Sequence, residues 1–421
     1  MSIQNEIDRI KVNVSAAFDA VSDMGGTVPS PAGSQNLAEA IRSIPAGGSS
    51  GTPGTVPLDP KAVYQATRPS DWLAMPTPAE DEIYLLFHIP DGMSSLLAFT
   101  VTCSGDYTVT VEGTNVQSAL ASGVKCEMEL YASDFEGLTS NGMRQAMIKI
   151  SGTDILTWEP SGHSKKPSPS KFSKWNIVEI ACNLPSGTKV ACGSSTANLA
   201  LQKLRYFTWI GENMVSDMSH MFRYCYALTA IPELDTSQAS LMSYMFNSDY
   251  SLTAVPEMDT SNVTAMDGMF NSCYALTAVP EMDTSNVTSM VGMFNYCYTL
   301  SAVPEMDTSK VTSMASMFAR CYALTAVPKL DTSNVTNMAN TFTDCHSLSV
   351  IRFVPSVTGW AGYAVSLKDC SLSHQAITGL FSSLPAITSA KTLTLTGNPG
   401  VSELTAEEKA IAAGKNWNLT L

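Results

Sequence analysis

Apolar side chains recur every 24 residues through the second half of the chain. The phenylalanines at this spacing are Phe222, Phe246, Phe270, Phe294, Phe318 and Phe342. Cysteines keep the same interval at Cys225, Cys273, Cys297, Cys321 and Cys345, and Asp249 stands where the remaining cysteine is expected. A fixed period of about 20–30 residues is typical of a solenoid, in which each coil buries its apolar side chains against its neighbours. The pattern therefore predicts a solenoid of 24-residue coils over residues 206–352.

The sequence of the coil that begins at Leu276 serves as an example from which the local structure of all the coils can be predicted. Residues 276–282 fit a short extended segment, and residues 283–285 fit a turn whose side-chain oxygens accept hydrogen bonds from free backbone N–H groups. From Val287 to Phe294 the apolar side chains follow the spacing i, i+3, i+6 and i+7, which predicts one or two helical or 3₁₀ turns. The methionines and cysteines of the coils are expected in the core, the cysteines as reduced thiols.

The first residues of the chain show a different period. Apolar side chains alternate at intervals of four and three, at Ile3, Ile7, Ile10, Val14, Ala17, Val21 and Met24. This heptad pattern predicts a coiled coil, and β-branched residues at both core positions favour three or four helices over two. We predict a homotrimer held by Ile3, Ile7, Ile10, Val14 and Val21, with a second helix near residues 35–44. A monomeric helical hairpin packed on its own domain is the alternative.

Before the repeats, residues 82–89 are expected to form a buried strand, and period-2 alternation predicts further strands at residues 97–103 and 107–113. We expect these strands to form a β-sandwich or jelly roll. After the repeats, the pattern predicts a helix over residues 372–384 and a strand that begins at Lys391.

A second helix of this terminal region is expected at Thr405, where the sequence contains a capping box, and it should end at Gly414. Residues 417–421 are expected to form a final strand. These elements would shield the open end of the solenoid.

Composition excludes several functions. The net charge is −14, which argues against nucleic-acid binding because that function requires a basic surface. No apolar run is long enough for membrane insertion, and no signal peptide is visible. The five histidines are scattered, and no metal-ligand spacing, nucleophile motif or phosphate loop is present. We therefore predict no enzyme activity, no catalytic residues, no cofactor and no metal site.

A tyrosine follows the cysteine position in five coils. These residues are Tyr226, Tyr250, Tyr274, Tyr298 and Tyr322, and His346 completes the row. Because the preceding cysteine points inward, the rings are expected to point outward as a binding surface. The alternative is that the rings pack on one another along the solenoid. A second row, Glu233, Glu257, Glu281 and Glu305, fits either a solvated face or contact with a basic partner.

The repeats resemble the bacterial surface-antigen type of leucine-rich repeat, which also occurs in mycoplasma lipoproteins. The resemblance is carried by residues 259–270 and 273–280 and covers about residues 214–352. It implies a repeat class rather than one function, because that family occurs in adhesins, secreted proteins and phage tail proteins.

The opening of the chain resembles the attachment segments of tail and fibre proteins from phages of Gram-positive hosts. Residues 3–11 and 38–45 carry this resemblance, which implies docking to a tail or baseplate and assembly as a trimer. Residues 68–73 and 107–113 resemble a β-domain that precedes such repeats in phage tail proteins.

We therefore predict a mixed, multidomain fold. It comprises a trimeric helical or coiled-coil segment at residues 1–46, a linker at 47–60, a β-sandwich at 61–205, a leucine-rich-repeat-like solenoid at 206–352 and a C-terminal cap at 353–421.

Three functions fit these features. The first is a phage tail protein of the virion that is made in the host cytoplasm, attaches to tail or baseplate proteins and binds a glycan or protein of the host surface. The second is a bacterial adhesin, either secreted or on the cell surface. The third is a tail-associated glycan hydrolase. Within the first, the lysine-containing segment 163–175 of the β-domain is the rival contact site to the tyrosine row.

Overall fold

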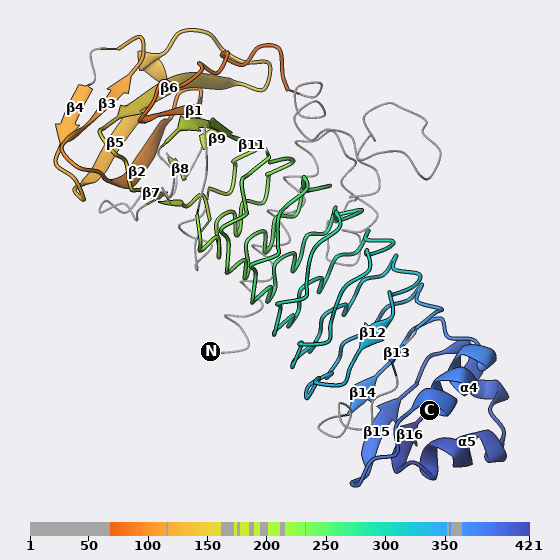
Figure 1. The fold of residues 1–421 in the computed structure, drawn as a ribbon. Coiled ribbons are helices and arrows are strands. Elements are labelled where there is room, and N and C mark those ends of the chain that lie inside the picture. Colours follow the sequence, from red (N-terminus) through yellow and green to blue (C-terminus); the bar gives the residue numbers. More distant parts are fainter. Residues whose placement is uncertain are drawn as a thin grey trace, which may run out of the picture. The chain divides into compact units, whose positions relative to one another are not determined.

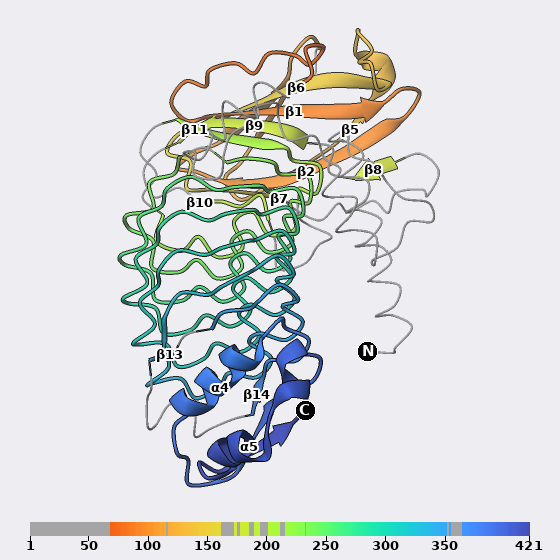
Figure 2. The ribbon, with the colours of Figure 1, turned by 90° about the vertical axis from the view of Figure 1, so that its right-hand side faces the viewer.

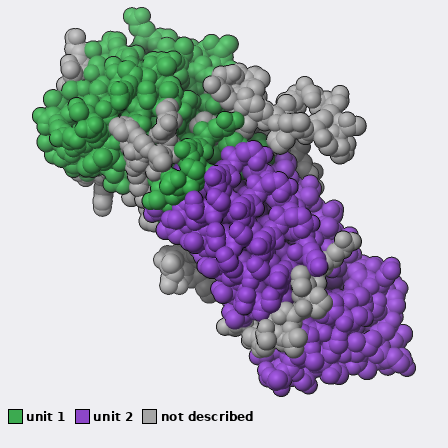
Figure 3. Space-filling view, viewed as in Figure 1, with its two compact units in different colours: residues 1–216, 220–238, 249–256 green, residues 217–219, 239–248, 257–421 purple. Residues whose placement is uncertain are grey.

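The structure is a computed structural model. It describes residues 68–114, 117–160, 172–174, 177–184, 189–193, 201–210, 215–231, 233–351, 353–354 and 364–421. The described residues form two compact units (Figure 3). Unit 1 contains the described residues up to 216 together with those of 220–238 and 249–256, and unit 2 contains the described residues of 217–219, 239–248 and 257–421.

Unit 1 contains two sheets. The first has the strand order β11-β9-β1-β6-β3-β4, and the second has the order β10-β7-β2-β5, with β8 also paired to β2. Their strands are β1 (Glu82–Pro90), β2 (Ser94–Thr102), β3 (Tyr107–Val111), β4 (Gln117–Leu120), β5 (Lys125–Tyr131), β6 (Met143–Ser151), β7 (Thr157–Pro160), β8 (Phe172–Lys174), β9 (Ile177–Asn183), β10 (Lys189–Val190) and β11 (Tyr206–Ile210). A 3₁₀ turn, η2 (Ala132–Asp134), follows β5. Both sheets are visible in Figure 1.

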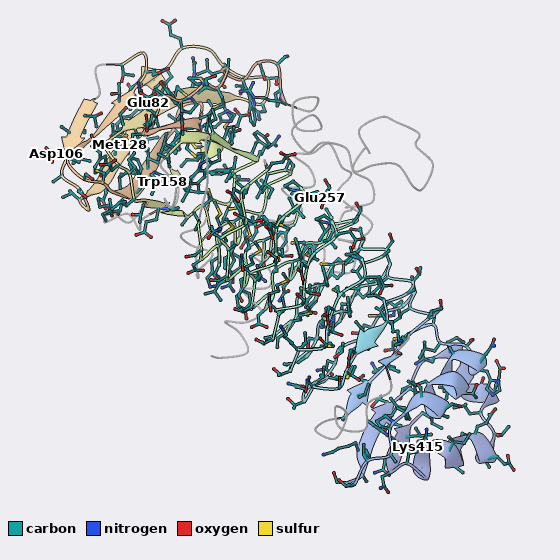
Figure 4. The ribbon with its side chains drawn as sticks, viewed as in Figure 1. Glu82, Asp106, Met128, Trp158, Glu257 and Lys415 are labelled. Carbon is teal, nitrogen blue, oxygen red and sulfur yellow. The ribbon has the colours of Figure 1, made fainter. Side chains whose placement is uncertain are left out.

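Burial along strands β1 and β3 confirms the two patterns predicted for them. In β3 the buried and half-buried positions alternate, as a strand with one covered face requires. In β1 every position from Ile83 to Ile89 is buried, as predicted, so both faces of this central strand are covered. Trp158 of β7, labelled in Figure 4, is fully buried and packs near Phe99.

Strand β11 connects the first sheet of unit 1 to the first coil. It pairs in parallel with β9, and Tyr206 also forms a parallel bridge with Ala230. The ring of Phe207 lies 5.3 Å from the ring of Phe222, the first of the periodic phenylalanines. The first coil therefore continues the hydrogen bonding of this sheet edge within unit 1.

The coils of unit 2 stack in parallel (Figures 1 and 2). Isolated parallel β-bridges join equivalent residues of successive coils, Leu241 to Ala265, Ala265 to Ser289, Ser289 to Ser313 and Ser313 to Asn337. After the bridge, alternate backbone N–H groups donate hydrogen bonds to backbone carbonyl groups of the following coil. Examples are Gly268 to Val291 at 2.8 Å and Phe270 to Met293 at 2.9 Å. The intervening N–H groups close turns within their own coil, as Asn271 does with Gly268 at 3.1 Å.

The helical or 3₁₀ turns predicted inside each coil are absent from the described coils, so this prediction was wrong. The segment is a run of tight turns in which every fourth residue has a left-handed backbone, as at Gly268 (φ 56°) and Ser272 (φ 63°). A left-handed residue interrupts a right-handed helix. The turns also place apolar side chains three or four residues apart, so their sequence pattern imitates that of a helix.

Gly268→Ala is expected to destabilise unit 2 more than Gly292→Ala. Both glycines have left-handed φ angles, of 56° and 62°, which costs a residue with a Cβ about 1–2 kcal/mol. A Cβ on Gly268 would also lie 2.5 Å from Cε1 of Tyr244, whereas its nearest neighbour at Gly292 would be 3.8 Å away. In urea denaturation we expect a loss of about 1 kcal/mol for Gly292→Ala and about twice that for Gly268→Ala. Equal losses would contradict the packing of Tyr244 on Gly268.

The predicted core of the coils is confirmed. All six periodic phenylalanines are fully buried, and in unit 2 their rings stack on one another. The centroids of successive rings from Phe246 to Phe342 lie between 5.5 and 5.7 Å apart.

The ladder cysteines are buried free thiols, as predicted. Each of those in unit 2 donates a hydrogen bond to a phenylalanine carbonyl of the preceding coil, for example Cys273 to Phe246 at 3.1 Å and Cys321 to Phe294 at 3.0 Å. The thiol therefore satisfies a buried backbone oxygen as well as filling the inner turn.

The predicted terminal elements are confirmed by α4 (His374–Ser383), β15 (Lys391–Thr394), α5 (Ala406–Ala413) and β16 (Trp417–Thr420). Helix α5 carries the predicted capping box between Thr405 and Glu408, and Gly414 is its C-cap residue. The remaining elements are β12 (Leu330–Asp331), β13 (Phe353–Val354), β14 (Val365–Ser366) and η4 (Pro399–Glu403).

The stack of coils continues into this terminal region. Strands β14, β15 and β16 form a parallel sheet. The thiol of Cys370 donates to the carbonyl of Phe342 at 3.2 Å, as the ladder cysteines do in earlier coils. Cys370 lies 25 residues after Cys345, so a search for an exact 24-residue period misses it.

The predicted fold class was wrong in its helical component. The described residues are mostly sheet and turn, and their α-helices are α4 and α5 alone, both near the C-terminus. The structure supports no helical coiled-coil segment. Residues 1–46, with the five predicted trimer contacts Ile3, Ile7, Ile10, Val14 and Val21, lie outside the described residues. The homotrimer stays a prediction from sequence.

Candidate binding surface

The tyrosines that follow the ladder cysteines stack on one another. In unit 2 the ring centroids of Tyr274, Tyr298 and Tyr322 lie 4.8 Å apart in succession, with interplanar angles of 7° and 1°. His346 continues the stack at 4.9 Å from Tyr322. We call these four residues the aromatic column.

The column combines both alternatives that the sequence left open. Its rings pack on one another, as one alternative proposed, and the three tyrosines remain partly exposed while His346 is exposed. Because each inner ring contacts a ring on both faces, solvent reaches the ring edges rather than the faces. The column therefore offers edges and hydroxyl groups to a partner.

Tyr226 and Tyr250 belong to unit 1 and differ from the column in their exposure. Their rings stack at 4.6 Å with an interplanar angle of 3°, but only 3% and 4% of their surfaces are exposed. The N–H of Ala227 donates to the carbonyl of Gln202 at 3.3 Å, which places the chain before β11 against this coil. The prediction that these two rings point outward was wrong.

An arginine–tyrosine pair lies beside the column and was not predicted. The guanidinium of Arg320 lies 4.8 Å from the ring centroid of Tyr296 and donates to its hydroxyl at 2.9 Å. The ring of Tyr296 meets that of Tyr298 edge to face at 6.1 Å. Arg320 also forms an ion pair with Asp344 at 3.4 Å. Neither Tyr296 nor Arg320 recurs in every coil, so periodicity could not reveal them.

Burial changes the acidity of the column. It raises the pKa of Tyr298 and of Tyr322 above the usual value for a phenol, and the neighbouring ring of Tyr274 adds to the effect at Tyr298. Both hydroxyls therefore remain protonated at neutral pH and can donate hydrogen bonds.

The acidic row lies in the solvent. Glu233, Glu257, Glu281 and Glu305 are all exposed, and Glu257 is labelled in Figure 4. Two residues further along each coil, an aspartate accepts a hydrogen bond from the backbone two residues ahead, as Asp283 does from the N–H of Ser285 at 2.9 Å. Hydrogen bonds from Ser285 lower the pKa of Asp283. These contacts confirm the predicted turn, and the glutamate row fits a solvated face.

The break in the cysteine ladder produces a buried carboxyl group in unit 1. Asp249 is 0% exposed, and its Oδ1 accepts a hydrogen bond from the N–H of Cys225 at 2.9 Å. Its Oδ2 is buried without a partner among the described residues. The buried thiols of Cys192 and Cys225 lie close enough to interact with it electrostatically. Burial raises the pKa of Asp249 well above its usual value.

Among the described ranges, no group of three or more potential ligands could hold a metal ion. In the same ranges, no helix is long and apolar enough to cross a bilayer. Residues 163–171 of the rival lysine-containing segment lie outside the described residues.

Comparison with known proteins gives one family match. Residues 202–301, and again residues 248–360, match a family described as "Mycoplasma protein of unknown function, DUF285". The matched residues are those of the coils and cover less than half of the chain. No curated protein matches the chain.

Proposed function

We propose that this chain is a structural and binding protein of a phage or phage-like tail, and that its coils contact the surface of the host cell. The observation that carries the proposal is the aromatic column, a row of equivalent, partly exposed side chains repeated at the coil spacing. Such a row can make several weak, equivalent contacts with a repetitive surface, and those contacts add up to avidity.

The location in a tail is supported by sequence resemblance. Residues 3–11 and 38–45 resemble the attachment segments of tail and fibre proteins, and the repeats resemble a class that also occurs in tail proteins. In this proposal the N-terminal residues attach to tail or baseplate proteins, and the partner on the host is a surface glycan or protein.

A bacterial adhesin, secreted or on the cell surface, is the second candidate. The family match favours it, because that family is described for mycoplasma proteins and mycoplasmas are cells rather than viruses. Both candidates bind through the coils, and they differ in the particle or cell to which the chain is attached.

Fractionation of a lysate separates the two candidates. We expect an antibody against the coils to detect the chain in tailed particles purified on a density gradient, and immunogold labelling to mark the tail. Recovery in the cell-envelope fraction, with none in particles, would instead support the adhesin. Recovery only as free protein inside the cells, with none in particles, in the cell envelope or in the culture medium, would contradict both.

A further inference from the structure

The ring atoms of the aromatic column that remain accessible to solvent indicate which chemical class of partner it can bind. This inference rests on the proposed function and deepens it. Successive rings of the column lie 4.8 to 4.9 Å apart and nearly parallel. At this distance the faces of Tyr298 and Tyr322 are in contact with neighbouring rings, so no partner can insert between them. A partner therefore cannot be recognised by stacking on these ring faces, although exposed aromatic rings commonly bind in that way.

The hydroxyl groups are the polar atoms that these two rings can offer. Those of Tyr298 and Tyr322 make no hydrogen bond within the part of the chain that the structure describes, and neither is among its buried polar atoms. Because both phenols stay protonated at neutral pH, each can donate one hydrogen bond and accept another. By contrast, the hydroxyl of neighbouring Tyr296 already accepts from Arg320.

We propose that the aromatic column binds a linear, uncharged glycan through hydrogen bonds from its tyrosine edges. A polymer of identical sugars presents oxygen acceptors at a constant interval, which suits donors repeated once per coil. A folded protein surface has no such repeat. The net charge of −14 disfavours a polyanionic polymer, because like charges repel as the two surfaces approach.

The test compares variants that keep the rings with variants that remove them. The labelled full chain is titrated against isolated, protease-treated Gram-positive cell walls from which anionic polymers have been removed. The double variant Tyr298→Phe with Tyr322→Phe preserves both rings and removes both hydroxyls. We expect it to lose about tenfold in affinity, the value for two hydrogen bonds of about 0.7 kcal/mol each. Tyr131→Phe, at an exposed tyrosine of β5, is the matched control and should bind like the parent.

Three other outcomes would each contradict the proposed hydrogen bonding to an uncharged glycan. If the double phenylalanine variant binds like the parent while Tyr298→Ser with Tyr322→Ser does not, the rings act by apolar contact and the hydrogen-bonding proposal is wrong. If the parent binds intact cells but not the treated walls, the partner is a protein or an anionic polymer; the proposal of an uncharged glycan then fails and the proposed function stands. If the parent binds neither walls nor cells, the proposed function fails with it.

Discussion

Phe294→Ala is expected to lower the free energy of unfolding by about 3–5 kcal/mol, which is the usual cost of truncating a fully buried phenylalanine. The ring of Phe294 is 0% exposed and lies between Phe270 and Phe318, at centroid distances of 5.7 and 5.6 Å. Its removal leaves a cavity between coils and breaks the stack in both directions. Since each coil contacts only its neighbours, packing elsewhere cannot compensate.

Urea denaturation followed by circular dichroism measures this loss. Val291→Ala is the matched control, because Val291 lies in the same coil and is 36% exposed. We expect that control to change stability by no more than about 0.5 kcal/mol. If the two substitutions cost the same, the phenylalanine stack does not hold the coils together.

Asp249→Cys is expected to stabilise the protein by about 3 kcal/mol at pH 7, the upper range for a buried polar group without a partner. The substitution restores the residue that stands at this position in the other coils. By analogy with Cys273, whose thiol donates to Phe246, we expect the introduced thiol to donate to the carbonyl of Phe222. The substitution also removes Oδ2 of Asp249, a buried oxygen that has no partner among the described residues. Little is lost at Cys225, because its N–H also donates to Phe222 at 3.0 Å.

This stabilisation should depend on pH. The pKa of Asp249 is raised in the folded state above its usual value of 3.8, because burial disfavours the charged carboxylate. Because the pKa is raised in the folded state, the carboxyl group makes its full contribution to the stability of the protein below about pH 4. This contribution is lost as the pH rises through the folded-state pKa. The parent should therefore lose stability from about pH 4 upward, relative to Asp249→Cys.

Asp249→Asn serves as the control for charge. It keeps the shape and polarity of the side chain but cannot ionise, so the pH dependence assigned to position 249 should disappear while the cost of a buried polar group remains. If the difference between parent and Asp249→Cys is the same at pH 4 and pH 7, the carboxyl group does not titrate as described.

The periodic part of the fold could be predicted from the sequence, because one signal was repeated in every coil. The spacing of Phe294 and its equivalents predicted the core, and Asp283 predicted the turn. The path of the chain between them could not be predicted from apolar spacing, since a helix and a run of tight turns place apolar residues at similar intervals. Glycines at 268 and 292 were the available signal for left-handed turns.

The binding surface could be predicted only in part, because exposure depends on tertiary packing. The tyrosine row follows from periodicity, yet Tyr226 and Tyr250 are buried, and the backbone beside Tyr226 is hydrogen-bonded to Gln202, which precedes the repeats. The sequence marked Asp249 as the break in the cysteine ladder, but its complete burial, close to the thiols of Cys192 and Cys225, depends on tertiary packing within unit 1. The arginine–tyrosine contact of Tyr296 and Arg320 does not recur in every coil, so it carries no periodic signal.

The binding of the labelled full chain to intact host cells, measured by flow cytometry, tests the central claim most directly. The claim is that the coils contact the host through the aromatic column. Replacing Tyr274, Tyr298 and Tyr322 together by serine should leave the cooperative unfolding transition in place and reduce cell binding by at least about tenfold, because several equivalent contacts are lost at once. A folded triple variant that binds cells as tightly as the parent would contradict the claim.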